Sequence, residues 1–279
     1  MPPYFAIPLT VLVACLFLFA LYVLSVAPAR RRAATAPFMG WHYAHRGLHN
    51  AHLPENSLAA FEAACRAGYG IELDVQLSRD GVAMVFHDAT LARVCGVEGR
   101  VCDYTAAELA RMPLLGKREH TIPTLAQVLR TVDGRVPLLV EIKGYVKVKP
   151  VCETAVALLD GYGGAYMIES FTPYVVHWFK KHRPAVVRGQ LSCRLYKRGK
   201  RSIGSLIVQS LCCNLITRPD FIAFRHTDRH LLSIRIAMHL YQAWTVAWTV
   251  KSAEEERACR SFNAIIFESY LPQKKGETI

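Results

Sequence analysis

The sequence lacks several features that would place it in a familiar class of protein. Its 279 residues contain nine cysteines, an odd number, and no pair of them has zinc-finger spacing. Cys212 and Cys213 are adjacent, which suits neither a zinc site nor an ordinary disulfide. This argues against a disulfide scaffold and predicts free thiols in a reducing compartment. The sequence has no internal repeat and no low-complexity tract, which argues against a repeat architecture.

Acidic residues are missing from one long stretch, Ser170 to Pro219. The same stretch holds ten of the 34 Lys and Arg residues, at positions 180, 181, 183, 188, 194, 197, 198, 200, 201 and 218. It therefore accounts for most of the net charge of +12. A charge of this size indicates an anionic partner, which is a nucleic acid, a membrane surface or a phosphorylated substrate. Few aromatic residues accompany the basic ones for base stacking, so we expect no nucleic-acid binding.

Charge of either sign is absent from residues 4–26. As a helix this segment spans about 35 Å, enough for a bilayer core of about 30 Å. No Lys or Arg precedes it, so the basic start of a signal peptide is missing, whereas Arg30-Arg31-Arg32 follows directly. The positive-inside rule then predicts a single-pass membrane protein with its large domain in the cytoplasm. A cleaved signal peptide is the alternative.

The pattern of the rest of the chain predicts one α/β domain. We expect residues 1–32 to be a transmembrane anchor with a basic flank, 33–40 a linker, and 41–279 the domain. Apolar, β-branched runs lie at 42–45, 70–77, 82–87, 137–143, 165–170, 186–191, 221–225, 243–249 and 263–268. Predicted helices lie at 57–67, 105–112, 125–131, 151–159, 173–182 and 253–260, the first with Asn56 as N-cap and Gly68 after its end.

Nine strands are one too many for an eight-stranded barrel, and connection length resolves this. Only Ser78 to Gly81 separates the second run from the third, whereas a parallel crossover needs a dozen or more residues. The third run must fold back as a hairpin, and Asp80-Gly81 is a strong two-residue turn. The remaining eight strands predict a TIM (β/α)8 barrel with one N-terminal transmembrane helix.

The hairpin brings three functional groups together. With Asp80 and Gly81 as the turn, Asp74 lies opposite His87, and Glu72 shares the face of Asp74. Two neighbouring carboxylates repel unless a positive charge lies between them, and a hard divalent cation with oxygen ligands is the natural solution.

Two further segments end predicted strands, where the catalytic residues of α/β barrels lie. In His45-Arg46-Gly47 the histidine can transfer a proton and the arginine can bind a phosphate with two hydrogen bonds. Glu141-Ile142-Lys143 places an acid and a base on one face. Each motif alone is weak.

Together these segments resemble the glycerophosphodiester phosphodiesterase family, strongly over residues 41–145 and more weakly to near the end of the chain. The matching segments, in order, are Ala44-His45-Arg46-Gly47, Pro54-Glu55-Asn56-Ser57, Ala60-Phe61-Glu62, Glu72-Leu73-Asp74-Val75, Asp80-Gly81, Val85-Phe86-His87-Asp88, Ile122-Pro123-Thr124-Leu125, Glu141-Ile142-Lys143, Glu169-Ser170-Phe171 and Ala247-Trp248-Thr249-Val250.

The resemblance implies a TIM barrel with a small insertion after the hairpin, at about residues 88–121. It also implies a role for each matching site residue. These roles are His45 and His87 as the acid–base pair, Glu72, Asp74 and Glu141 as ligands of one Ca²⁺ or Mg²⁺ ion, Arg46 and Lys143 as phosphate partners, and Glu55, Asn56 and Trp248 as pocket residues.

The end of the last strand departs from the family pattern. A Thr-Asp pair followed closely by Pro is usual there, whereas this chain has Phe267-Glu268-Ser269-Tyr270-Leu271-Pro272. Either Glu268 replaces the Asp or the end of the barrel differs. This affects the expected far wall of the pocket and the substrate, not the metal site.

The resemblance implies metal-dependent hydrolysis of glycerophosphodiesters to an alcohol and sn-glycerol 3-phosphate. One alternative is a phospholipase D that acts on lysophospholipids or sphingolipids. Another is an inactive, membrane-bound binding module, which the presence of every expected site residue argues against.

One loop suggests where such an enzyme works. Residues 194–216 combine a basic run, Arg194 to Arg201, with a mostly apolar one, Ile203 to Ile216. We expect this loop to bind an anionic membrane surface, with the active-site mouth facing the cytoplasmic leaflet. A barrel helix with a solvated basic face is the alternative.

Overall fold

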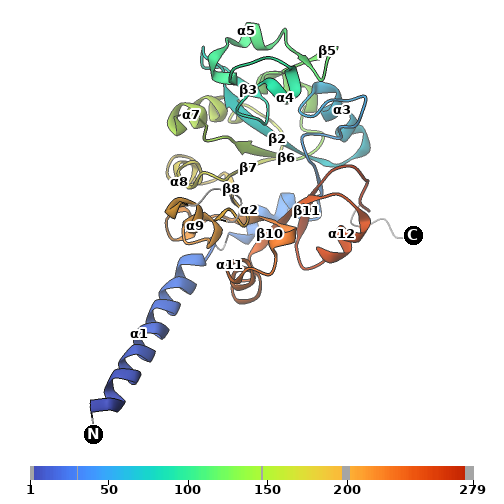
Figure 1. The fold of residues 1–279 in the computed structure, drawn as a ribbon. Helices are drawn as coiled ribbons and strands as arrows, with labels where there is room; N and C mark the ends of the chain where they lie inside the picture. Colours follow the sequence, from blue (N-terminus) through green and yellow to red (C-terminus); the bar gives the residue numbers. More distant parts are fainter. Residues whose placement is uncertain (1–2, 30, 146, 197–201, 274–279) are drawn as a thin grey trace.

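Eight parallel strands close into a barrel in the computed structural model, which describes residues 3–29, 31–145, 147–196 and 202–273 (Figure 1). The strands pair in chain order, and the first also pairs with the second. They are β1 (Tyr43–Ala44), β2 (Gly70–Leu77), β6 (Leu138–Ile142), β7 (Tyr166–Ser170), β8 (Val187–Ser192), β9 (Phe221–Arg225), β10 (Trp244–Val250) and β11 (Ala264–Phe267). The predicted TIM barrel is confirmed.

Helices follow the strands and cover the outside of the barrel (Figure 1). They are α3 (Leu58–Ala67), α6 (Leu125–Val132), α7 (Val148–Leu159), α8 (Pro173–His182), α9 (Ile203–Gln209), α10 (Asn214–Thr217), α11 (Leu232–Arg235) with the π-turn η5 (Ile236–Leu240), and α12 (Ala253–Ala258). The expected linker at 33–40 also carries short helices, α2 (Arg32–Thr35) and η1 (Ala36–Phe38). Buried Phe38 joins the core inside the barrel.

The start of α3 differs from the prediction. Its N-cap is Ser57, whose hydroxyl accepts a hydrogen bond from the backbone N–H of Ala60, and not Asn56. An N-cap residue needs an extended backbone, whereas Asn56 has φ of +55°. The Asn56 side chain instead donates to Asp74, with Nδ2 2.8 Å from Oδ2. Gly68 ends the helix as predicted, in the left-handed conformation.

The predicted hairpin forms, with β3 (Ala83–Val85) antiparallel to β2, but its register is one residue off. Val75 pairs with Val85, so the backbone N–H of Phe86, not that of His87, meets the carbonyl of Asp74 at 2.9 Å. The loop has three residues because Gly81 adopts φ of +79° and bonds back to Ser78.

His87 reaches the expected face for a different reason. The chain leaves the sheet after Val85, and Gln76 holds it there. The Gln76 amide donates to the carbonyls of Phe86 and Asp88 at 2.6 and 2.7 Å. His87 lies beyond the end of β3, so the alternation of side chains along that strand does not determine its direction.

Residues 88–121 form the expected insertion, a small body at one end of the molecule (Figure 1). It has its own apolar core, which includes Leu91, Val101, Leu109 and Leu114. Its elements are α4 (Ala92–Cys95), η2 (Val101–Asp103), α5 (Ala106–Leu109), β4 (Pro113–Leu114) and β5 (Lys117–Thr121). The helix expected at 105–112 is thus a single turn.

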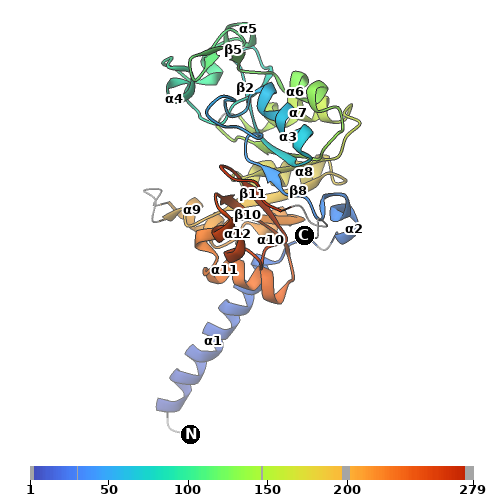
Figure 2. The same ribbon diagram turned by 90° about the vertical axis from the view of Figure 1, so that its right-hand side faces the viewer.

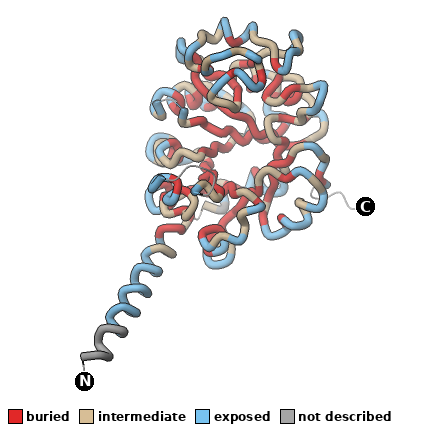
Figure 3. Tube along the Cα trace, viewed as in Figure 1, coloured by how far each residue is buried: buried red, intermediate tan, exposed pale blue. Residues whose placement is uncertain are grey.

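The inside of the barrel is apolar below and polar at the mouth. Buried residues, drawn red, make up most of the strands of the barrel wall (Figure 3). The lower layer includes Tyr43, Leu139, Met167, Phe221, Val246 and Ile266. Alternate residues of a strand share a face, so the next inward positions lie at the carboxyl ends of the strands. Those positions are His45, Glu141, Glu169, Ala223, Trp248 and Glu268, with Arg225 one step above Ala223.

The N-terminal helix α1 (Pro3–Val26) projects away from the barrel, beside α9, α10 and α11 (Figures 1 and 2). Residues Leu9–Val26 are long and apolar enough to cross a membrane, a test that a signal sequence also passes. The end of the helix is built into the barrel. Val26 is fully buried and its carbonyl accepts from Asn214, while the Tyr241 hydroxyl donates to the carbonyl of Val23.

Candidate active site

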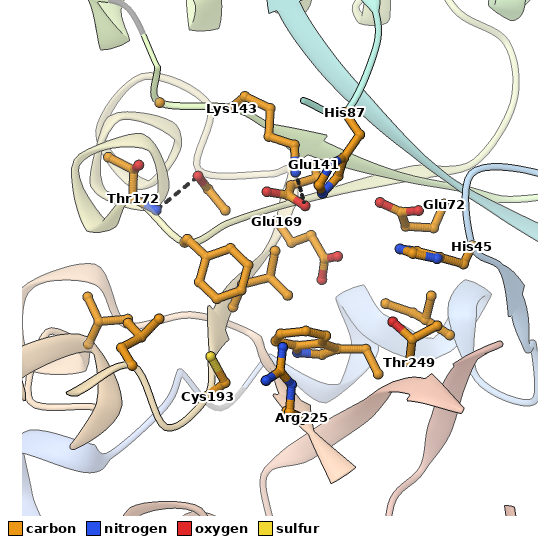
Figure 4. Close-up of a pocket in the computed structure, with 18 of the residues that line it drawn as sticks. His45, Glu72, His87, Glu141, Lys143, Glu169, Thr172, Cys193, Arg225 and Thr249 are labelled. Carbon is orange, nitrogen blue, oxygen red and sulfur yellow. Dashed lines mark hydrogen bonds and ion pairs between the residues drawn. The ribbon is translucent and has the colours of Figure 1, made fainter. Parts of the chain in front are cut away.

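A cavity of about 730 Å³ opens at the carboxyl ends of the strands (Figure 4). A cavity of this size suits a small-molecule ligand, and this end of a TIM barrel is where active sites lie. Its lining includes seven of the predicted site residues, which are His45, Arg46, Glu72, His87, Glu141, Lys143 and Trp248. The other three contact these, because Asp74 binds Lys143, Glu55 binds Arg46, and the Asn56 backbone N–H donates to the Arg46 carbonyl.

Neighbouring strands place acidic side chains side by side. Asp74 pairs with Glu141, and Glu141 pairs with Glu169. Glu72, Asp74 and Glu141 are buried, and one oxygen of each lies within 4.8 Å of the others. Burial, together with the charge of Asp74, raises the pKa of Glu72 well above its usual range. Burial also raises the pKa of Glu141.

Two basic residues offset part of this negative charge. The Lys143 ammonium lies 2.8 Å from Asp74 Oδ1 and 2.7 Å from Glu141 Oε2. The Arg46 backbone N–H donates to Glu72 at 2.9 Å, and its Nε lies 3.7 Å from Asp74 Oδ2. Burial would raise the pKa of Asp74, but these cations and His87 hold it below its usual range.

The three carboxylates fit a divalent cation. They offer only oxygen donors, which Ca²⁺ and Mg²⁺ prefer. All three are buried, and Lys143 and Arg46 are the two basic residues of the described chain that lie within ion-pair distance of them, two cations for three carboxylates. Because the Asn56 amide already holds Asp74, the donor set is oriented in advance.

The turn after β1 explains the His-Arg-Gly sequence. Arg46 and Gly47 have φ of +56° and +81°. A Cβ at position 47 would lie 2.9 Å from the Ala60 carbonyl carbon and from the Phe61 ring. Glycine therefore allows α3 to pack against this turn, which points the Arg46 backbone N–H at the acids.

Glu55 acts at the rim of the cavity. Its carboxylate binds Arg46 Nη1 at 2.7 Å and both terminal nitrogens of Arg93. Arg93 belongs to the insertion and also binds Asp88. Glu55 thus joins the insertion to the barrel and orients Arg46.

Each cavity histidine is backed by a carboxylate. His45 Nδ1 lies 2.5 Å from Glu268 Oε2, and His87 Nδ1 lies 2.6 Å from Asp88 Oδ1. In each case the carboxylate binds Nδ1 and leaves Nε2 for other partners. Burial lowers the pKa of His45 to about 4, although Glu268 opposes this, and burial also lowers the pKa of His87.

Glu268 is the centre of its own network. The hydrogen bond from His45, followed by the contact with His49, lowers its pKa below the usual range. Lys251 forms an ion pair with its second oxygen. The departure from the family pattern at the end of β11 therefore leaves a carboxylate behind His45.

Among the cavity residues outside the predicted set, three carry an acidic, aromatic or basic side chain at the carboxyl end of a strand. Glu169, Phe171 and Arg225 all line the cavity. Each lies at or just beyond the carboxyl end of a strand, at an inward position. Counting inward positions from the buried layer below would have found them.

Parts of the chain match known proteins in sequence. Residues 45–201 match the Glycerophosphoryl diester phosphodiesterase family. The chain is similar to the glycerophosphodiester phosphodiesterase of Caldanaerobacter subterraneus, with 35% identity over 53% of this chain and 65% of that protein. It is also similar to human glycerophosphodiester phosphodiesterase 1, with 34% identity over 37% of this chain and 33% of that protein. The matched region spans less than two thirds of either relative.

Solved structures share the barrel. An Oleispira antarctica phosphodiesterase, determined with the product sn-glycerol-3-phosphate, superimposes with a TM-score of 0.68 at 20% identity, over 82% of this chain and 93% of that one. A glycerophosphodiester phosphodiesterase from Thermotoga maritima gives a TM-score of 0.61 at 26% identity, over 81% and 94%. The first likeness shows the fold alone.

Addition of Ca²⁺ or Mg²⁺ is expected to raise the thermal unfolding midpoint of the full chain by about 5 °C or more at saturating concentration. Glu72→Gln replaces one carboxylate with a neutral amide, a weaker ligand for a divalent cation, and should abolish the rise. Gln has nearly the same size and shape as Glu, so the variant is expected to fold.

The control is Glu153→Gln, which changes an exposed carboxylate on α7 and should leave the rise intact. Differential scanning fluorimetry in detergent measures both. An equal cation-induced rise in the two variants would show that the ion binds elsewhere.

Proposed function

Because the chain belongs to the glycerophosphoryl diester phosphodiesterase family, we propose that it hydrolyses glycerophosphodiesters to an alcohol and sn-glycerol 3-phosphate. One observation carries the proposal: two carboxylate-backed histidines, His45 and His87, share a cavity with a buried cluster of three acids. Proton transfer to and from oxygen, next to a charge-neutralising site, is the chemistry that phosphodiester hydrolysis needs.

The acidic cluster would hold one Ca²⁺ or Mg²⁺ ion through Glu72, Asp74 and Glu141. When bound, the ion supplies positive charge against the phosphoryl oxygens. Arg46 and Lys143 line the same cavity and add to that charge. Lys143 can contribute fully once an ion takes over its contacts with Asp74 and Glu141.

His45 is the better candidate for the general base. It is the more buried histidine, with 17% of its side chain exposed against 30% for His87, and its lowered pKa of about 4 keeps it neutral near pH 7. Its Nδ1–H donates to Glu268, so Nε2 can accept a proton from the attacking hydroxyl. That hydroxyl is water or the glycerol hydroxyl next to the phosphate. His87 would then protonate the leaving alcohol.

We assign catalysis to residues 41–279, with 33–40 as the connection and 1–32 as an anchor in a membrane. The last turn of α1 supports a retained helix over a cleaved leader. Val26 belongs to the main apolar core, and Tyr241 and Asn214 hydrogen-bond to the helix. Cleavage would remove these contacts. The basic flank points to a cytoplasmic catalytic domain.

The barrel surface around α1 fits a bilayer. Helix α1 packs on α10 and η5, and the short helices at this end of the barrel, α9, α10, α11 and η5, carry exposed apolar side chains (Figure 1). We call this set the apolar collar, and its members are Ile203, Leu206, Ile207, Leu215, Ile216, Leu232 and Leu240. The collar includes part of the expected membrane-binding loop 194–216, of which 197–201 lie outside the described residues. It also includes Leu232 and Leu240, from a second segment of the chain.

The collar changes the expected orientation. Helix α1 runs roughly across the barrel axis, so the side of the barrel rather than its mouth faces the membrane (Figures 1 and 2). The α9 rim of the cavity lies on that side, because Gly204, Ser205 and Val208 line the cavity. The nearby lining residues Leu191 and Leu195 are apolar, which favours a lysophospholipid as a second candidate substrate.

The full chain should hydrolyse glycerophosphoglycerol when Ca²⁺ or Mg²⁺ is present, and a chelator should abolish the activity. His45→Ala is expected to lower kcat by about 10²- to 10⁴-fold, because it removes the proposed base. Release of sn-glycerol 3-phosphate, measured with a coupled dehydrogenase, reports both.

His52→Ala is the matched control, since His52 is exposed outside the cavity, and it should keep full activity. Turnover that survives chelation or His45→Ala would refute the mechanism. A parallel assay with a lysophospholipid decides between the two substrates.

Glu268→Gln should lower kcat by roughly 10- to 100-fold, because His45 loses the carboxylate that orients it. It should also move the acid limb of the kcat/KM profile to lower pH. The Glu268 carboxylate raises the pKa of His45, so its removal lets that pKa fall further and keeps the base neutral in more acidic solution.

The control is Glu254→Gln, which changes an exposed carboxylate on α12. Profiles of kcat/KM from about pH 3 to pH 9, which cover the acid limb expected from the His45 pKa of about 4, compare the variants. A lower plateau with an unmoved acid limb would show that Glu268 is only structural.

A photoreactive p-benzoylphenylalanine at Leu215 or Ile216 should form covalent adducts with phospholipid when the full chain is reconstituted in anionic nanodiscs. Both side chains are exposed and belong to the collar. The same label at Leu115, an exposed leucine of the insertion far from α1, should form almost none (Figure 1). Mass spectrometry of the irradiated protein detects the adducts. Equal labelling at the two places would contradict the membrane pose.

A further inference from the structure

Arg225 ends β9 on the wall of the cavity opposite Lys143 and Glu141 (Figure 4). It lies above the barrel core, to which Phe221 and Ala223 of the same strand belong. The predicted mechanism makes no use of it. A guanidinium at this place therefore needs another explanation.

Arg225 differs from the other cavity cations in having no acidic partner. Lys143 binds Asp74 and Glu141, and Arg46 binds Glu55, whereas no described carboxylate lies within ion-pair distance of Arg225. Its Nη1 is buried and has no hydrogen-bond acceptor among the described residues. A buried donor without an acceptor is costly, so such groups indicate a ligand that supplies one.

The cavity acids do not supply the missing charge. Glu169 is the acid on the same inner wall that is not part of the three-acid cluster, and it forms no ion pair with Arg225. The Arg225 guanidinium is therefore an uncompensated positive charge at this end of the cavity.

Trp248 adds a second unsatisfied donor and fixes the arginine. Arg225 Cζ lies 4.7 Å from the centre of the Trp248 ring, and the Phe171 ring meets Trp248 edge to face at 5.5 Å. The indole Nε1 is buried without an acceptor among the described residues. Stacking orients the guanidinium without taking its in-plane donors, which stay free to bind an anion.

The same stacking excludes one kind of substrate. An exposed tryptophan face binds quaternary ammonium groups such as choline through cation–π attraction. Here the guanidinium of Arg225 already covers a face of Trp248. A second cation would meet an occupied ring and a like charge.

We propose that Arg225 and Trp248 form a subsite for a negatively charged group, a phosphate or a carboxylate, on the alcohol part of the substrate. The inference rests on the proposed function, in which the reacting phosphodiester lies at the acidic end. Substrates whose alcohol part carries an anion are preferred, and those with choline are disfavoured. Arg225 sets specificity and takes no part in proton transfer.

The test uses the full chain in detergent with two probes. One is bis(glycerophospho)glycerol, which carries a second phosphate, and the other is glycerophosphocholine. The wild-type kcat/KM should favour the first by at least about tenfold, and Arg225→Gln should remove most of this preference through KM, with kcat little changed. Arg225→Lys keeps the charge but loses the planar fork, so it should retain part of the preference.

Binding separates this proposal from the proposed function. Isothermal titration of the His45→Ala variant gives Kd for each probe without turnover. A preference for the anionic probe that disappears in the double variant His45→Ala, Arg225→Gln supports the subsite, even if no hydrolysis is found.

Two results would overturn the subsite. One is equal Kd and equal kcat/KM for the two probes when Arg225 is present. The other is an equal loss for both probes on Arg225→Gln, which marks a structural role. Absence of turnover with every probe would overturn the hydrolase proposal alone.

Discussion

Asp74 and Glu141 lie side by side on neighbouring strands, both buried and both in contact with the Lys143 ammonium. Burial of like charges at this distance is unfavourable unless positive charge is held just as firmly. Lys143 and Arg46 provide positive charge, and neighbouring groups hold the carboxylates and Arg46 in place. The left-handed turn at Arg46 directs a backbone N–H to Glu72, Asn56 fixes Asp74, and Glu55 holds the Arg46 side chain.

Carboxylates have two separate uses at the mouth of the barrel. Glu72 and Glu141 lie deep on β2 and β6, where burial and the charge of Asp74 raise their pKa values. Those at the edge, Glu268 and Asp88, bind both a basic residue and a histidine. The deep group has the donors that suit a cation, and each edge carboxylate holds a histidine in place. Environment alone separates the two roles.

Much of this was predictable because it follows from periodicity. The strands predicted at 70–77 and 221–225 match β2 and β9 residue for residue, and the helix predicted at 173–182 matches α8. Strands and amphipathic helices have fixed repeats, which the sequence displays directly. The hairpin register was not predictable, because Asp80-Gly81 suits loops of two or three residues and only the backbone angle of Gly81 decides. The role of Arg225 was hidden for another reason. Its ring partner, Trp248, lies on the next strand, 23 positions along the chain.

The last turn of α1 packs into the core that supports the barrel, through Val26, and Arg31 ties the following segment to Asp220. Such a joint has little freedom to swing. With α1 in a membrane, as proposed, the catalytic domain would sweep a thin layer at fixed height, whereas a domain on a loose tether would search a volume above the membrane. Encounter with a lipid substrate would then be a two-dimensional problem, set by diffusion within the bilayer plane. The height of the active site above the membrane would thus be set by the helix–barrel junction, far from the reacting atoms.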